Sequence, residues 1–305
     1  MALNSIIYQM LSLFSIVAVG FTANKLKVLT AEGNKILAKL VINVAMSAMI
    51  IASVLTVEKS LNSKDIIILL AAGFLTYIVF IPIAYLTPRI LRAPKDKYGL
   101  YSFMAIFGSV GYMGFPVLAS ICGNNAVFYA ALFTIPFDLL VFSVGVLLIA
   151  PGESVQIKRD ILLSPPFLAS VLALILYFVP FSLPNMLVEA TTLLGDMTTP
   201  GAMLVIGASL AEISWREVFG NWRLYFLAAA KLLLCPLLIF ICFRWFIHNP
   251  LIMAVAVITS AMPIATNTTM ICMEHNGDEA LASKGIFIST IMSIFTIPFI
   301  ITILM

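Results

Sequence analysis

Long apolar runs, each about the length needed to cross a bilayer, set the strongest limit on how this chain can fold. A membrane-spanning helix needs about 20 mostly apolar residues. Ten stretches meet this need, and short polar or Pro/Gly-marked loops separate them: residues 5–23, 34–56, 66–86, 97–121, 126–150, 161–179, 187–210, 224–247, 251–273 and 281–304. Because the runs are long and do not alternate between apolar and polar residues, they predict helices rather than the strands of a membrane barrel.

The composition leaves lipid as the only suitable solvent. Of the 305 residues, 62% are hydrophobic and 10% are charged, whereas a soluble domain carries about 25% charged residues. Such a chain has too little polar surface to cover itself in water. We therefore expect a multi-pass, all-α protein of the cell (inner) membrane, with the lipid bilayer as a partner and no contact with nucleic acid.

Basic residues gather in the loops that follow odd-numbered stretches. These are Lys25, Lys27, Lys35, Lys39, Arg89, Arg92, Lys95, Lys97, Lys158, Arg159, Arg216 and Arg223, against Lys59, Lys64 and Arg244 after even-numbered stretches. Since cytoplasmic loops are enriched in Lys and Arg, the first set should be cytoplasmic. Both termini are then expected on the outer side.

The two halves of the chain match each other at a constant spacing of 154 residues. The matching pairs are Pro82 with Pro236, Gly123-Asn-Asn-Ala126 with Gly277-Asp-Glu-Ala280, and Ser47-Ala-Met49 with Gly201-Ala-Met203. Five helices is an odd number, so the second half enters the membrane in the opposite sense, as in many transporters. This predicts a first five-helix repeat at 1–150, a cytoplasmic linker at 151–160 and an inverted repeat at 161–305.

Two stretches at equivalent places in these repeats are poor continuous helices. The fourth contains Gly108-Ser-Val-Gly-Tyr-Met-Gly-Phe-Pro116, and the ninth contains Ala261-Met-Pro-Ile-Ala-Thr-Asn-Thr-Thr269. In a helix interior Gly costs about 1 kcal/mol and Pro about 3 kcal/mol. The simpler interpretation is that Gly and Pro only kink packed helices. Their equivalent positions favour broken helices at a substrate site instead.

A helix broken inside the membrane has chemistry of its own. Its unpaired backbone groups must be buried in protein or line a wet cavity. The N-terminus of the second half presents free N–H groups and the positive end of the helix dipole, which suit an anion such as a carboxylate. Hydroxyl and amide side chains in the same segments can complete the hydrogen bonds.

These motifs resemble the auxin efflux carrier family. Gly108-x-x-Gly-Tyr-Met-Gly-Phe-Pro116 is similar to the family's glycine-rich fourth helix, and Pro200-Gly-Ala-Met-Leu-Val-Ile-Gly-Ala-Ser-Leu210 to its seventh. Ala261-Met-Pro263, Gly277-Asp278 with Ala282-Ser283, and Leu40-Val-Ile-Asn43 resemble its ninth, tenth and second helices. The chain departs from the pattern at Ser109, where the family usually has Asn, and at Ser47, where it often has Pro. The short linker is similar to that of bacterial members.

The resemblance implies ten helices in two inverted five-helix repeats, with crossed and broken helices 4 and 9. It also implies a homodimer and an elevator mechanism, in which helices 3–5 and 8–10 move past a scaffold of helices 1, 2, 6 and 7. The cargo is expected to be a small organic anion, such as a carboxylic or auxin-like acid. The expected substrate-binding residues are Asn43, Gly108, Ser109, Gly111, Tyr112, Pro116, Pro263, Thr266, Asn267 and Thr268. Asn43 has the alternative role of bridging two helices, and Tyr112 of packing.

Three ionisable residues fall at membrane depth, where such groups are usually functional. Asp138, Asp196 and Lys231 are candidates for coupling transport to H⁺ or Na⁺. The alternative for each is a structural hydrogen bond or an ion pair within the bundle.

Other function classes lack their signatures in the sequence. We find no nucleophile paired with a base, no His-Glu-x-x-His motif and no selectivity-filter motif, so we expect neither an enzyme nor a channel. The cysteines Cys122, Cys235, Cys242 and Cys272 lack the spacing of metal ligands, and no metal or cofactor is expected. A sodium-coupled symporter of the bile-acid type, which has a related fold, is the alternative function.

Overall fold

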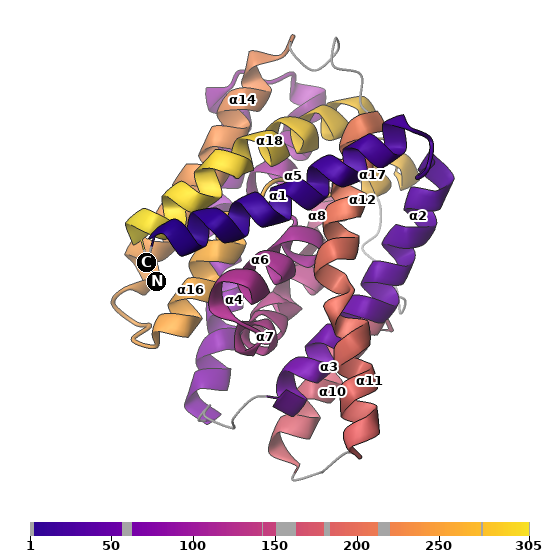
Figure 1. Cartoon of the computed structure of the whole chain (residues 1–305). Helices are drawn as coiled ribbons and strands as arrows, with labels where there is room; N and C mark the ends of the chain where they lie inside the picture. The colour runs from indigo at the N-terminus through magenta and orange to yellow at the C-terminus, as the bar shows by residue number, and fades with distance from the viewer. Residues whose placement is uncertain are drawn as a thin grey trace. The chain divides into compact units, whose positions relative to one another are not determined.

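The computed structural model describes residues 3–56, 63–141, 143–150, 163–179, 184–212, 220–275 and 277–304, which are almost entirely helical (Figure 1). The first half contains α1 (Leu3–Lys25), α2 (Ala31–Leu40), the π-helix η1 (Val41–Met46), α3 (Ser47–Thr56), α4 (Ser63–Ile90), the 3-10 turn η2 (Lys95–Lys97), α5 (Tyr98–Ile106), the π-helix η3 (Val110–Gly114), α6 (Phe115–Cys122), α7 (Asn125–Val141) and α8 (Val144–Ile149). The second half contains α10 (Pro165–Phe178), α11 (Asn185–Asp196), α12 (Thr198–Glu212), α14 (Trp222–Ala229), the π-helix η4 (Ala230–Leu234), α15 (Cys235–Phe243), α16 (Pro250–Ser260), α17 (Asn267–Glu274) and α18 (Glu279–Leu304).

The expectation of a helical membrane protein is confirmed. Within the described ranges, six helical segments are long and apolar enough to cross a bilayer, and four shorter apolar helices accompany them. The shorter ones are Leu11–Lys25, Val110–Cys122, Pro165–Phe178 and Pro250–Ser260. Two of these adjoin the predicted breaks, because a helix interrupted at mid-membrane leaves two short halves. The predicted linker at 151–160, with Lys158, and also Lys59, Arg159 and Arg216, lie outside the described residues.

The chain divides into two compact units, each built from both halves of the sequence. Unit 1 comprises Met1–Leu70, Gly111–Ile135 and Arg159–Glu212, and unit 2 comprises Ala71–Val110, Pro136–Lys158 and Ile213–Met305. Unit 1 thus contains the first, second, sixth and seventh apolar stretches, together with α6 and most of α7. Unit 2 contains the third stretch from Ala71 onward, the first part of the fourth, the end of the fifth, and the eighth to tenth.

Unit 1 is held together by a close approach of α1 and α12, which lie against each other in Figure 1. Gly207 and Gly20 form this contact. A Cβ atom built on Gly207 would lie 2.0 Å from the carbonyl oxygen of Val17, and one on Gly20 would lie 2.4 Å from that of Leu204. Only glycine allows the two backbones to come this close, as is common between helices in membranes.

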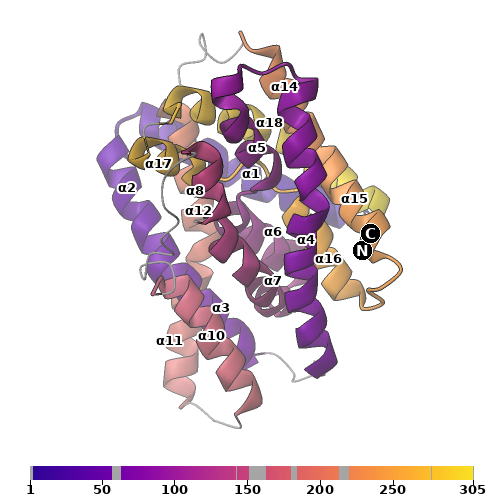
Figure 2. The ribbon, with the colours of Figure 1, turned by 180° about the vertical axis from the view of Figure 1, so that it is seen from behind.

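Unit 2 packs an aromatic cluster around the end of α5. The ring of Phe107 lies 4.6 Å from that of Phe103, 5.6 Å from that of Tyr77 and 5.9 Å from that of Phe137, measured between ring centroids. Alongside, α5 packs on α4 (Figure 2), and the hydroxyl of Ser102 donates to the carbonyl of Ala84 at 2.6 Å. These contacts fix the place where α5 stops.

Basic side chains near the helix ends donate hydrogen bonds to backbone carbonyls of other helices. In unit 1, Lys25 after the first stretch donates to the carbonyl of Ala211 at the end of the seventh. In unit 2, Arg223 before the eighth stretch donates to the carbonyl of Leu91 after the third. The placement of these loops on the cytoplasmic side stays a prediction.

The close approach at Gly207 gives the first testable prediction. Gly207→Ala should lower the thermal unfolding midpoint in detergent, because the added methyl group collides with backbone atoms of α1 and overpacking costs about 1–3 kcal/mol. Gly33→Ala in α2 is the matched control. Its nearest contact would be an ordinary 3.4 Å, so its midpoint should stay level or rise slightly. An unchanged midpoint for Gly207→Ala would contradict the close packing of α1 and α12.

Candidate functional site

The two predicted breaks are present, and in unit 2 they pair with each other. After α5 ends at Ile106 the chain becomes extended, and α16 and α17 are separated by residues 261–266. Gly108 and Ile264 form an antiparallel bridge between these segments. The amide of Ser109 donates to the carbonyl of Pro263 at 2.7 Å, and the amide of Ala265 donates to that of Phe107 at 3.1 Å. We call residues 107–109 and 263–265 the crossover.

Side chains from neighbouring helices pair further backbone groups at the crossover. The ammonium of Lys231 donates to the carbonyl of Ile106 at 2.7 Å, and the thiol of Cys235 lies 3.6 Å from that of Ala105. The hydroxyl of Ser289 accepts from the amide of Ile264 at 3.1 Å. Each of these groups would otherwise be unpaired in a membrane interior, where a missing hydrogen bond is costly.

Two buried polar atoms beside the crossover lack a hydrogen-bond partner. They are the hydroxyl oxygen of Ser109 and the side-chain oxygen of Asn267. By contrast, the hydroxyl of Thr268 bonds to the carbonyl of Ala265, and that of Thr269 to Thr266. Buried polar atoms are nearly always paired, so an exception calls for an explanation. A polar ligand at the crossover would give both atoms a partner.

The predicted substrate-binding residues divide between the two units. Unit 2 brings together Gly108, Ser109, Pro263, Thr266, Asn267 and Thr268 at and just beyond the crossover. Unit 1 contains Asn43, Gly111, Tyr112 and Pro116. Asn43 is exposed in η1, Gly111 and Tyr112 are half-buried in η3, and Pro116 is buried in the first turn of α6. Three of the four therefore lie in π-helical turns, which are frequent at functional sites.

The three ionisable candidates lie in different surroundings. Asp138 belongs to α7, and its side chain lies outside the described part of the molecule. Lys231 is buried in η4, directly beneath the crossover. Asp196 is exposed at the end of α11 and borders a cavity in unit 1.

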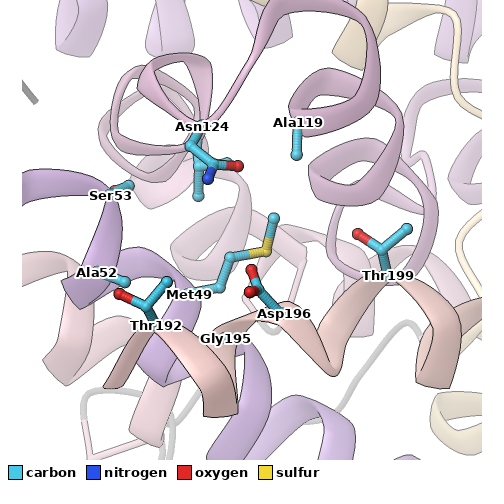
Figure 3. A pocket seen from close by; sticks show the side chains of 10 residues that line it. Met49, Ala52, Ser53, Ala119, Asn124, Thr192, Gly195, Asp196 and Thr199 are labelled. Carbon is cyan, nitrogen blue, oxygen red and sulfur yellow. The ribbon is translucent and has the colours of Figure 1, made fainter. Parts of the chain in front are cut away.

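This cavity has a volume of about 70 Å³ and a partly polar lining (Figure 3). Asn124 and Asp196 face it from opposite sides, with the side chain of Met49 between them. The remaining lining residues are Ala52, Ser53, Ala119, Val127, Thr192, Gly195 and Thr199. On this measure one water molecule needs about 10–15 Å³, so the cavity has room for several water molecules or a hydrated ion.

Sequence reasoning did not find this cavity, although it singled out Asp196. The other polar lining residues come from α3, α11, α12 and the turn before α7, far apart in the chain. A weak signal was available, because Gly123-Asn124 stands out as a polar loop motif repeated at Gly277-Asp278.

An ion pair in unit 2 joins the start of the first broken helix to the start of the continuous helix α18. Lys97, just before α5, donates to Asp278, just before α18, and Asp278 also accepts from the amide of Leu281 at 2.9 Å. Burial works against the charged form of Asp278, but these hydrogen bonds outweigh it and lower the pKa of its carboxyl group. The hydrogen bond to Asp278 raises the pKa of Lys97.

Comparison with known proteins, like the broken helices, indicates a membrane transporter. A family model described as "Membrane transport protein" matches residues 5–301. The chain belongs to this family of transporters, the auxin efflux carrier family. The resemblance seen in the motifs is thereby confirmed, and the protein is a transporter rather than an enzyme.

Named relatives of this family member are transporters too. An "Uncharacterized transporter" of Methanothermobacter thermautotrophicus is 29% identical over 294 residues, which cover 94% of this chain and 95% of the relative. An "Uncharacterized transporter" of Methanocaldococcus jannaschii is 26% identical over 293 residues, 92% of this chain and 93% of the relative. A "Putative malonate transporter" of Rhizobium meliloti is 26% identical over 233 residues, 73% of this chain and 72% of the relative.

The ion pair makes a prediction about pH. The pKa of Asp278 is lower in the folded protein, so its stabilising effect is complete above the unfolded carboxyl pKa of about 3.9. That effect is lost as the pH falls through the folded pKa. Asp278→Asn keeps an acceptor for Leu281 but loses the charge, and should lower the unfolding midpoint modestly at pH 7, since exposed pairs contribute about 1 kcal/mol or less. The difference from the parent should shrink below about pH 4. A difference that stays constant down to pH 3 would argue against a charge effect.

Proposed function

We propose that this transporter is an elevator-type carrier that moves a small organic anion, such as a dicarboxylate, across the membrane. In this proposal ten spans form two inverted repeats, and the anion binds at the crossover of helices 4 and 9. The observation that carries the proposal is the pairing of two broken helices in one compact unit, with the polar atoms of Ser109 and Asn267 left without partners beside them.

The chemistry of the crossover favours an anion. The unpaired Ser109 hydroxyl can donate a hydrogen bond to an anion. The unpaired oxygen of Asn267 only accepts, so Asn267 would meet an anion through the NH₂ group of its amide. Asn267 begins α17, so the positive end of that helix dipole lies at the same place. The Rhizobium relative is named for malonate, a small dicarboxylate, and this name supports an organic acid as cargo.

The division into units supports movement of the crossover as one body. Unit 2 contains both crossover segments, α5, η4 and the Lys97–Asp278 pair. These parts can therefore move together. Unit 1 contains spans 1, 2, 6 and 7, the proposed scaffold and surface of the expected homodimer. It also contains α6 and most of α7, which belong to spans 4 and 5 and which the proposal assigns to the moving part. Both termini on the outer side complete the proposed arrangement.

A coupling cation, if transport uses one, has a suitable place at the unit 1 cavity. Asp196 supplies a carboxylate there, and Asn124 and Thr199 supply neutral oxygen atoms, the ligand type that hard cations prefer. Coupling to H⁺ at Asp138 or Asp196 is the related proposal. These sites would also serve the alternative function, a sodium-coupled symporter of the bile-acid type.

Substitution of Asn267 and Pro263 tests the proposed anion site at the crossover. Asn267→Ala and Pro263→Ala should lower uptake of radiolabelled malonate into proteoliposomes at least tenfold, because each removes a group that shapes the anion site. A thermal-shift screen of the parent protein against a panel of organic acids first establishes whether malonate binds, since a bound ligand raises stability. Thr302→Ala, at the exposed end of α18, is the control and should transport at the parent rate. Parent-rate uptake by both folded crossover variants would refute the site.

The cation site is tested separately by ligand-induced stability. Sodium chloride should raise the unfolding midpoint of the parent protein more than choline chloride does, because a bound cation stabilises the folded state. Asp196→Asn should abolish this difference while Thr302→Ala retains it. Equal responses of the parent and Asp196→Asn to sodium would exclude Asp196 as a sodium ligand.

A further inference from the structure

Lys231 is a fully buried basic residue in unit 2. Its side chain is 1% exposed, and its ammonium donates to the carbonyl of Ile106 and lies 5.1 Å from the centroid of the Phe80 ring. Ile106 is the last residue of α5, so this carbonyl stands at the negative end of a helix dipole. A helix C-terminus and the face of an aromatic ring both favour the charged ammonium.

The surroundings of Lys231 supply hydrogen-bond acceptors and an aromatic face, all of them uncharged groups among the described side chains. None of the carboxylates whose side chains the structure describes forms an ion pair with it. Burying a charge without a counter-ion is expensive, and such residues inside membranes usually serve function. Pairing the carbonyl of Ile106 requires only a hydrogen-bond donor, which a neutral side chain supplies equally well. The presence of an ionisable residue here, rather than a neutral donor, therefore calls for an explanation.

Lys231 lies directly against the crossover. A Cβ atom built on Gly108 would be 3.5 Å from Cε of Lys231, and Gly108 is the residue that bridges to Ile264. Ser109, with its unpaired hydroxyl oxygen, is the next residue. The ammonium is thus held within a few ångströms of the backbone on which the proposed anion site is built.

We infer that Lys231 is a specificity-determining residue that supplies the counter-charge for an anion bound at the crossover. Its ammonium is fixed by Ile106 and Phe80 behind the crossover backbone, so it acts through space rather than by contact. It makes the site select ligands by their negative charge. This inference rests on the proposed function and deepens it, and it gives Lys231 a role in anion selection instead of ion coupling.

The size of the effect follows from Coulomb's law. At a separation of about 7 Å and an effective dielectric constant of about 20, a unit charge pair contributes enough to change a dissociation constant by roughly ten- to fifty-fold. The contribution scales with the charge of the ligand. Removing the charge of Lys231 should therefore weaken the binding of a dianion most, that of a monoanion less and that of a neutral analogue hardly at all.

Binding of three ligands of one shape tests this inference. Malonate, monomethyl malonate and malonamide carry about two, one and no negative charges at pH 7, and their dissociation constants are measured by calorimetry on the purified full chain. The variants are Lys231→Gln, which keeps a donor toward Ile106, Lys231→Met, which does not, and Lys231→Arg, which keeps the charge. Cys235→Ala is the matched control, because Cys235 approaches the neighbouring carbonyl from the same helix without a charge.

The expected result is a loss graded by ligand charge. Lys231→Gln and Lys231→Met should raise the dissociation constant of malonate by a factor at least ten times larger than that of malonamide. Lys231→Arg and Cys235→Ala should keep the parent's preference for malonate. An equal loss for all three ligands would show that Lys231 only caps α5, and would overturn the inference. A parent protein that binds malonamide as tightly as malonate would overturn it without any variant. If the parent binds no acid at all, the proposed function itself fails, a result distinct from an equal loss.

Discussion

The whole structure depends on one requirement: in a membrane interior, every backbone N–H and C=O group must find its partner inside the protein. Continuous helices such as α4 and α18 meet it alone. The broken helices do not, and they meet it by pairing with each other, where Ser109 bonds to Pro263 and Ala265 to Phe107. If only one helix were broken, its unpaired backbone N–H and C=O groups would be costly. With two broken helices side by side, the backbone groups of each can bond to those of the other. The pairing thus compensates for the helix-breaking glycines and prolines of the two motifs.

Most of the fold could be predicted from the sequence, because lipid imposes local rules on it. The lengths of the apolar runs located the helices, and Gly108–Pro116 and Pro263–Thr269 located the breaks. Contacts between segments far apart in the sequence could not be predicted from it. Neither the bond from Lys231 to Ile106 nor the cavity beside Asp196 has a local signature, since each joins residues more than 60 positions apart. Sequence reasoning found Lys231 by its rarity at membrane depth and left its contacts open.

The positions where this chain departs from its family's motif acquire meaning in the structure. Ser109 replaces the usual Asn, and Ser47 the frequent Pro, and both hydroxyl oxygens are buried without a partner. A hydroxyl reaches less far than an amide and occupies less space. In the proposed site, a serine at position 109 would leave more room for an anion than an asparagine while keeping one hydrogen-bonding group. The proposed role of Lys231 in selecting the ligand would then matter more.

The pairing at the crossover also constrains how the protein is made. The first break is synthesised at about residue 108, but its partners at Pro263 and Ala265 emerge more than 150 residues later. At about 5–20 residues per second this interval lasts roughly 10–30 s. Throughout that time the backbone of the first break must stay hydrated or be shielded by the insertion machinery. The two halves of the chain are consequently coupled in biogenesis, because the backbone pairing of residues 107–109 is complete only after residues 263–265 have been made.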